Sequence, residues 1–399
     1  MSATPADLIG KAAAAQRERL IALRREIHRH PELGLTTPRT QEIIVRELER
    51  TDGVEGIATG DDCTWVTAEI RGGAAGAGTR RVALRADMDA LPLTETGDDE
   101  WVSELDGRMH ACGHDGHVAM LLGAASVLAG SRDHFSGTVR LLFQPGEEGF
   151  GGAPVMIDAG AVDDVDAAFA IHLQPMARPH RVLYRNGAML AAFDDFTVTF
   201  LGAGGHASSP HTTRDPIPAI GPLVDTLSHV VARETDPDDR VVFSVTKVVA
   251  GTKENVIPHS AECLGTVRSL SKQGRELALE RLRRVADGIA LARGLDVRVE
   301  IRPGYPPTIN RAGAVADVVV AARSLGLTER EMASTFMGAE DFSYMLDRVP
   351  GAMVFLGCGV PGGGPLHSDR MRIDEDVLPT GAALHAAVAL QMLSDASAA

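Results

Sequence analysis

The feature that most constrains the fold of this chain is a recurring short apolar strand that ends in a polar loop containing glycine or proline. Four segments have this form: RVALRADMDALP (81–92), TVRLLFQPGEEG (138–149), DAAFAIHLQP (166–175) and AMVFLGCG (352–359). The apolar run VAMLLGAASVLAG, typical of a buried helix, separates the first two, and the shorter helical stretch APVMIDAG (153–160) separates the second from the third. Strands that alternate with helices predict a doubly wound α/β sheet covered on both faces. Before it, residues 7–29 and 39–50 are predicted to be helical.

A second pattern interrupts the first. Strands are predicted at 194–201, 241–249, 260–269 and 296–302, with helices at 215–234 and 274–294. The order β-α-β-β-α-β is that of a ferredoxin-like α+β unit. Glycine and proline near Gly187 and at Pro303–Pro307 indicate hinges at both ends. We therefore predict a discontinuous main domain, residues 1–187 and 307–399, with an inserted smaller domain at 188–306.

Charge and cysteine usage narrow the class of protein. The formal charge of −15 argues against nucleic acid or an anionic membrane as a partner, because both attract basic surfaces. The longest apolar run has 13 residues, too few to span a bilayer, and the first residues do not resemble a signal peptide. Four scattered cysteines suit a reducing cytoplasm, and Cys63, Cys263 and Cys358 are expected to be small buried residues. We expect a cytoplasmic protein.

Polar residues that can bind metal follow the predicted strands. In an open α/β sheet ligands gather outside the carboxyl ends of the strands, so these side chains are candidates for one site. They are Asp87 and Asp89 after the first strand, Glu147 and Glu148 after the second, His172 at the end of the third and His367 after the fourth, with Cys112 and His114 just ahead of a helix.

Cys112 and His114 stand two residues apart in HACGH, so in an extended segment both could face one ion. A buried cysteine beside a helix-capping polar group explains the pair equally well. A structural zinc site would need a second close pair of ligands, and the sequence has none of that kind. A mixed Cys/His/Glu set drawn from distant loops instead favours an open, catalytic site.

The adjacent acids Glu147 and Glu148 favour catalysis more strongly. Neighbouring side chains diverge, so one carboxylate can bind metal while the other accepts a proton from water. A solvated acidic loop is the alternative, but the pair follows an apolar strand and Pro145–Gly146. His172 alone would more often be a core histidine, and His367 alone an exposed loop residue.

Eight motifs in order, RADMDALP, HACGHDGH, FQPGEEG, AIHLQP, GGHASSPH, NVIPHSAECLGTVRSL, GAEDFSYML and PLHSD, resemble the aminoacylase-type di-metal peptidases. The resemblance is to the branch of hippurate hydrolase, auxin-conjugate hydrolases and N-acyl-amino acid deacetylases, and it covers about residues 20 to 390. It implies a catalytic domain with a ferredoxin-like lid and dimerisation domain. It also implies two divalent ions (Zn or Mn; Co or Ni are compatible) on Cys112, His114, Glu148, His172 and His367, with Glu147 as general base.

The resemblance has one departure and several consequences. The wider family has a His-x-Asp metal motif where this chain has Asp87-Met88-Asp89, so we expect Asp87 and Asp89 to orient a ligating histidine. Asp115 could be a helix N-cap, and His110 and His117 are read as structural. In the lid, the resemblance implies that His206 and Asn255 assist the oxyanion, and that Arg268 pairs with a substrate carboxylate unless it simply faces outward from its strand. It further implies a homodimer through the lid.

The function expected is metal-dependent hydrolysis of a small-molecule N-acyl-amino acid to a carboxylic acid and a free amino acid. A dipeptidase or aminopeptidase could use the same site, with Asp87 or Glu340 near the substrate amine. A metal-binding or redox-sensing protein could use Cys112, but a sensor has no need of an unligated base such as Glu147 beside its metal. A catalytically inactive homologue is a further alternative, although every expected ligand type is present.

Overall fold

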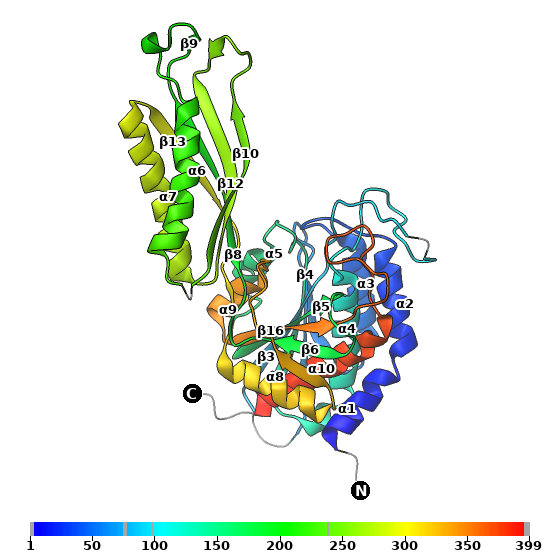
Figure 1. Cartoon of the computed structure of the whole chain (residues 1–399). Coiled ribbons are helices and arrows are strands. Elements are labelled where there is room, and N and C mark those ends of the chain that lie inside the picture. Colours follow the sequence, from blue (N-terminus) through cyan, green and yellow to red (C-terminus); the bar gives the residue numbers. More distant parts are fainter. Residues whose placement is uncertain (1–3, 75–77, 98, 238, 395–399) are drawn as a thin grey trace. The chain divides into compact units, whose positions relative to one another are not determined.

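The computed structural model describes residues 4–74, 78–97, 99–237 and 239–394, which form two compact units (Figure 1). The first comprises Met1–Met189, Ile309–Ser334 and Asp341–Ala399, and the second Leu190–Thr308 and Thr335–Glu340. The predicted division gave the whole of 307–399 to the main domain. Thr335–Glu340 belongs instead with the second unit, because Leu190 bridges Phe336 and the amide of Ala191 donates to the carbonyl of Gly338. The predicted limits at residues 1 and 399 lie outside the described residues.

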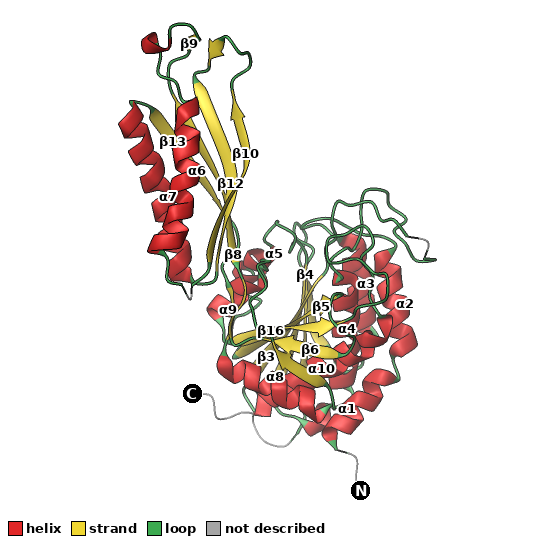
Figure 2. Cartoon of the chain, in the orientation of Figure 1, coloured by secondary structure: helices red, strands yellow, loops and turns green. Residues whose placement is uncertain are grey.

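An eight-stranded mixed sheet forms the centre of the first unit (Figure 2). Its order is β1(Glu55–Thr59)-β2(Val66–Arg71)-β4(Thr138–Gln144)-β3(Arg81–Asp87)-β5(Ala167–Gln174)-β16(Gly351–Gly357)-β6(Arg181–Tyr184)-β15(Thr328–Glu331). The four central strands β4, β3, β5 and β16 are parallel, whereas β2 and β6 join them antiparallel. The central strands are buried along almost their whole length, which is why they appear in the sequence as continuous apolar runs.

Helices pack against this sheet in two groups. One contains α1(Pro5–Ala14), α2(Arg17–His28), α3(Pro38–Glu49), α4(His114–Ala129), α8(Ala312–Ser324) and α10(Leu378–Ser394), and the other contains α5(Gly152–Asp158) and α9(Phe342–Arg348). The helix predicted at 7–29 is two helices, interrupted at Ala15–Gln16. The first begins with a capping box between Thr4 and Asp7, followed by Pro5 at its first position. Helix α4 is buried on nearly every side, so its sequence shows no polar face.

One helical stretch, Glu375–Ser394, is long and apolar enough to cross a membrane by length and composition alone. The prediction from apolar runs had not identified it. Its last 17 residues form α10, which packs on α1, α4 and α8 and on strands β3 and β5. Since 67% of its most apolar window is buried inside the protein, packing in the core of the first unit accounts for its hydropathy.

The second unit contains a four-stranded antiparallel sheet in the order β10(Val241–Ala250)-β12(Ser260–Ser269)-β8(Ala192–Leu201)-β13(Asp296–Pro303). Helices α6(Ile220–Glu234) and α7(Lys272–Arg293) pack together and on this sheet. The chain order is β-α-β-β-α-β, as the sequence indicated. Inward residues of β8 such as Phe196, Val198 and Phe200 alternate with outward ones and build the core of the unit. Four short strands of the described chain lie outside these two sheets and form two pairs. They are β9(Gly205–His206) with β11(Val256–Ile257), and β7(Gly187–Leu190) with β14(Thr308–Asn310).

The topology of the first unit brings the predicted site residues to one edge. After β3 the chain passes through α4 to β4 on one side of β3, and then through α5 to β5 on the other side. Such a reversal of strand order opens a crevice at the carboxyl ends of the parallel strands. The loops that follow β3, β4 and β5 therefore meet at this edge.

Candidate metal centre

Five side chains that can bind metal converge at this edge, and all belong to the first unit. Two sets of three place their ligand atoms within 4.8 Å of one another: Cys112, His114 and His172 in one, and Cys112, Glu148 and His367 in the other. The Cys112 sulfur lies 3.4 Å from His172 Nε2 and 3.3 Å from His367 Nε2, and Glu148 Oε1 lies 3.2 Å from His367 Nε2. Cys112 is common to both sets.

Hydrogen bonds to the backbone orient two of the histidines. His114 Nδ1 lies 2.8 Å from the carbonyl oxygen of Asp89, and His172 Nδ1 lies 2.7 Å from that of Leu173. A carbonyl can only accept, so each Nδ1 carries a proton, and Nε2 is the nitrogen that can bind a metal. This is the arrangement found around metal-binding histidines. The Nε2 atom of His114 is buried and has no hydrogen-bond partner in the part of the chain that the structure describes.

Asp89 joins the loops after β3 and β4. Its Oδ1 accepts from the amide of Glu147 at 2.9 Å, and its Oδ2 accepts from the amide of Glu148 at 3.1 Å. Its backbone carbonyl, as described above, orients His114. Both the side chain and the main chain of Asp89 are therefore engaged in hydrogen bonds, and its carbonyl orients His114.

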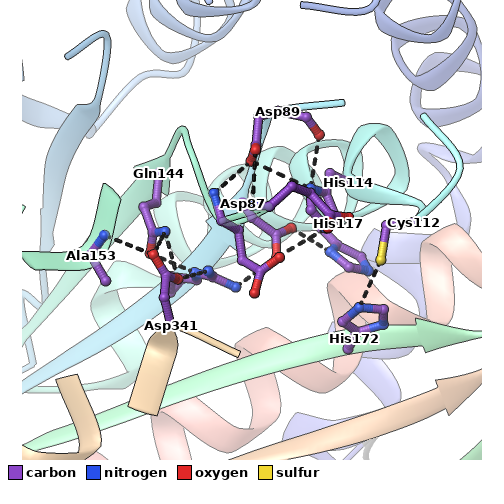
Figure 3. Close-up of polar contacts among 12 residues, drawn as sticks. Asp87, Asp89, Cys112, His114, His117, Gln144, Ala153, His172 and Asp341 are labelled. Atoms are coloured by element: carbon purple, nitrogen blue, oxygen red, sulfur yellow. Dashed lines mark hydrogen bonds and ion pairs between the residues drawn. The ribbon is translucent and has the colours of Figure 1, made fainter. Parts of the chain in front are cut away.

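Asp87 lies in a buried network, most of which Figure 3 shows. Its carboxylate accepts from His117 Nδ1 at 2.5 Å and from Arg85 Nη1 at 2.7 Å, and lies 3.6 Å from His114 Nε2. The amide of Leu173 donates to His117 Nε2 at 2.8 Å, so both nitrogens of His117 are used inside the protein. His117 therefore has no lone pair left for a metal, which agrees with its structural assignment.

Arg85 extends the network to a residue to which the sequence analysis gave no role. The guanidinium also bonds Gln144 and Asp341, and Asp341 accepts from Gln144 and from the amide of Ala153 at the start of α5. Two signals in the sequence could have indicated this buried network. Arg85 interrupts an otherwise apolar strand, where a buried charge requires partners, and Asp87 at i+2 points to the same face.

Burial and neighbouring charges set the protonation of His114, Cys112 and His172. Although burial opposes it, Asp87 and Asp89 raise the pKa of His114 to about 10. Burial, together with Glu148 and Glu147, holds the pKa of the Cys112 thiol well above its usual value. Burial and His117 keep the pKa of His172 well below normal, so that this imidazole stays neutral. A thiolate at Cys112 therefore requires a cation beside it, which argues against an isolated redox-active thiol.

These residues fit divalent metal ions. One thiol, three imidazoles and one carboxylate form a mixed set of borderline ligands, of the kind used by zinc and other first-row ions. Among the described residues, Nε2 of His114 has no hydrogen-bond partner, so a cation can replace its proton, and the nearby carboxylates supply the negative charge that a cation needs. Glu147, whose carboxylate groups with His114 and Glu148, is 7% exposed and lies beside both ligand sets.

The expectation that Asp115 caps a helix is wrong. The N-cap of α4 is Gly113, in a left-handed conformation at φ 87°, and no side chain caps this end. Asp115 lies in the first helical turn, fully buried, with Oδ2 at 2.6 Å from Arg24 and 2.8 Å from His28. Its charge is thus balanced by α2. His110 is buried nearby, and burial lowers its pKa to about 3.

The three site residues predicted in the second unit do not gather in one place. His206 and Asn255 lie together, because β9 pairs with β11 and the amide of Ala207 donates to the carbonyl of Asn255. Arg268 lies opposite Phe193 near the far end of β12, with its guanidinium 5.1 Å from the centre of that ring. At about 3.3 Å per residue, Ser260 and Arg268 of this strand are about 26 Å apart.

Comparison with known proteins identifies the family. The chain is 40% identical over 379 residues to thermostable carboxypeptidase 2 of Saccharolobus solfataricus, covering 93% of this chain and 95% of that one. It is 40% identical over 292 residues to the N-acyl-L-amino acid amidohydrolase of Geobacillus stearothermophilus, covering 73% and 78%. The crystal structure of a dinuclear metal-binding peptidase of the M20 family from Bacillus subtilis superimposes with a TM-score of 0.83 at 34% identity, covering 95% and 99%. Residues 83–391 match the model of peptidase family M20/M25/M40, and the chain belongs to that family.

Proposed function

We propose that this protein is a metal-dependent amidohydrolase that cleaves N-acyl-amino acids to a carboxylic acid and a free amino acid. The observation that carries the proposal is the arrangement at the sheet edge, where Cys112 is shared by two ligand sets and Glu147 lies beside both. Relatives named as an N-acyl-amino acid amidohydrolase and a carboxypeptidase support the reaction class, because both names describe hydrolysis of an amide bond to an amino acid.

The two ligand sets would hold two divalent ions. Cys112, His114 and His172 would hold one, and Cys112, Glu148 and His367 would hold the other. When bound, the ions would polarise the amide carbonyl and make water a nucleophile at neutral pH. Zn and Mn are the first choices, and the donor set also accommodates Co or Ni.

Glu147 would act as the general base. The bond from its amide to Asp89 fixes the loop, and burial keeps its carboxylate out of bulk water. In this position the carboxylate takes a proton from the attacking water. As the amide bond breaks, Glu147 donates the same proton to the leaving amine nitrogen. Glu148, turned towards His367 and Cys112, would remain a metal ligand throughout.

The second unit would act as a lid and dimerisation domain. His206 and Asn255 would stabilise the oxyanion, and Arg268 would pair with the carboxylate of the amino acid. Within one chain, Arg268 lies at the other end of the sheet from His206 and Asn255. One substrate can therefore contact all three side chains only if two chains contribute. This separation supports a homodimer in which His206 serves the partner's site.

We also place the protein in the cytoplasm. The four cysteines, Cys63, Cys112, Cys263 and Cys358, are free and buried in the structure, which suits a reducing compartment. A thiol that binds metal is kept reduced there.

A hydrolysis assay on protein of known metal content tests the function. Amino acid release would be measured with N-acetyl, N-benzoyl, longer N-acyl and indoleacetyl amino acids. Peptides that a carboxypeptidase would cleave and dipeptides with a free amine would be assayed alongside. We expect hydrolysis of N-acylated substrates, loss of activity with a chelator and recovery with Zn or Mn. Preferential cleavage of peptides with a free amine would favour an aminopeptidase or dipeptidase, and full activity in metal-free protein would contradict the proposal.

A further inference from the structure

His367 differs from the other four candidate ligands in its backbone and exposure. It has a φ of 63°, in the left-handed region that residues other than glycine rarely adopt, and it lies in a segment without helix or strand. Its side chain is 54% exposed, whereas Cys112, His114 and His172 are buried. Such a conformation persists only where surrounding contacts hold it.

Contacts on two sides hold the segment that carries His367. On one side, the amide of His367 donates to the carbonyl of Ala111 at 2.8 Å, directly before Cys112. On the other side, Thr96 donates its amide to the carbonyl of Asp369 at 2.8 Å and its hydroxyl to the carboxylate of Asp369 at 2.7 Å. We call these contacts, together with the ion pair between Arg372 and Asp99, the loop clasp.

An ion pair completes the loop clasp. Arg372 Nε lies 3.0 Å from Asp99 Oδ2, so Thr96 and Asp99 on one loop face Asp369 and Arg372 on the other. The first of these loops is itself anchored to the protein, because Glu95 accepts from the amide of Ser103 at 2.8 Å and lies 3.1 Å from Nε2 of the buried His28. The loop clasp therefore fixes the His367 segment to a firmly attached part of the first unit.

We propose that the loop clasp is a positioning device for His367 and governs how long an ion stays bound by Cys112, Glu148 and His367. This inference rests on the proposed di-metal function. When the clasp is loosened, His367 spends more time away from Cys112 and Glu148, and the ion in that set dissociates faster. The set of Cys112, His114 and His172 contains no residue of the His367 segment, so its ion is retained.

A zinc-release experiment on the full chain tests this. Wild type and Thr96→Val are each loaded with zinc and mixed separately with an excess of a colorimetric zinc chelator. The release of the first and of the second zinc ion is then followed in time. Valine has the shape of threonine without its hydroxyl, whereas Thr96→Ser keeps the hydroxyl. Thr94→Val is the matched control, because Thr94 makes a similar exposed hydrogen bond to Asp106, at 3.1 Å, outside the clasp. Asp99→Asn gives a second test through the ion pair.

We expect Thr96→Val to release one of its two ions about two- to tenfold faster, while the release rate of the second ion is unchanged. This acceleration corresponds to the net free energy of about one hydrogen bond. Thr96→Ser and Thr94→Val should match wild type, and Asp99→Asn should show a smaller acceleration of the same phase. Equal rates in Thr96→Val and Thr94→Val would overturn the inference, as would equal acceleration of both ions. A wild type that binds fewer than two zinc ions would instead refute the di-metal centre itself.

Discussion

Glu147 and Glu148 are adjacent in the chain yet have different surroundings. Glu148 faces His367 and Cys112, and although burial opposes it, the contact with His367 lowers the pKa of Glu148 below its usual value. It is therefore suited to be a charged ligand. Glu147 groups with His114 and Glu148 but belongs to neither of the two sets built on Cys112.

Substitution should separate the two glutamates. Glu147→Gln should keep both ions and bind substrate but lose about 10²- to 10⁴-fold in kcat, because the amide cannot accept the proton of water. Glu148→Ala should lose one ion of the two. Elemental analysis, substrate titration and kcat distinguish these outcomes. Equal loss of metal in both variants would contradict the division of roles.

At the scale of elements, the site depends on side chains that join neighbouring strands. Arg85 and Asp87 of β3 link to Gln144 of β4, to His117 of α4 and to Asp341 at the start of α9. His114, Arg85 and His117 hold the pKa of Asp87 well below its usual value against the effect of burial, so its charge is a fixed part of the network. The ligand loops are therefore attached to a rigid frame.

Asp89 provides the element-scale prediction. In Asp89→Asn one side-chain oxygen is replaced by an NH₂ group, which cannot accept from either amide, so one of the two bonds to the glutamate loop is lost. We expect unfolding to become easier by about 1–3 kcal/mol and kcat to fall at least about tenfold. Metal content should persist, because the backbone carbonyl still orients His114. Loss of metal with an intact melting temperature would contradict this account.

At the scale of the whole molecule, we expect one buried histidine to make the stability depend on pH. His385 of α10 is fully buried against Phe169, neither ring nitrogen has a hydrogen-bond partner among the described residues, and burial lowers its pKa to about 3. As pH falls below about 6.5 the unfolded chain takes up a proton that the folded protein refuses. Stability is therefore lost from about pH 6.5 down to about pH 3.

His385→Leu should remove this contribution. The free energy of unfolding of chelator-treated protein, measured by denaturant titration at several pH values, should fall less steeply in the variant. The difference should approach about 1.4 kcal/mol per pH unit below pH 6.5. His110, whose pKa is also lowered to about 3, remains in both proteins, so a residual slope is expected. Parallel curves would show that His385 is not the cause.

Assembly gives the second prediction at this scale. Inactive His206→Ala and Glu147→Gln proteins are mixed under conditions in which subunit exchange is proven by mass or fluorescence. If His206 serves the partner's site, each mixed dimer has one site with both defects and one with neither, so part of the activity returns. No recovery would assign His206 to its own chain's site, or to none. Metal content should be unchanged in His206→Ala.

Much of this protein could be predicted from local sequence. The apolar strands and polar loops indicated an α/β sheet with a group of metal-binding side chains at one edge, because strand periodicity is local and parallel strands bring their carboxyl ends together. The β-α-β-β-α-β order of the second unit followed in the same way. The antiparallel strands β2 and β6 could not be predicted in this way, since sheet order depends on contacts between distant segments. The break between α1 and α2 was not predicted either.

Only the tertiary structure decided how individual polar residues are used. His114 and His117 occur in the same HDGH stretch, but Asp89 engages only Nδ1 of His114 and leaves Nε2 for a metal, whereas Asp87 and Leu173 occupy both nitrogens of His117. Asp115 looks like a helix cap in the sequence and is a buried ion-pair partner of Arg24. The sequence by itself determined which chemical groups reach the edge of the sheet. The fold decided which of them keep a free lone pair, because hydrogen bonds from other elements satisfy the rest.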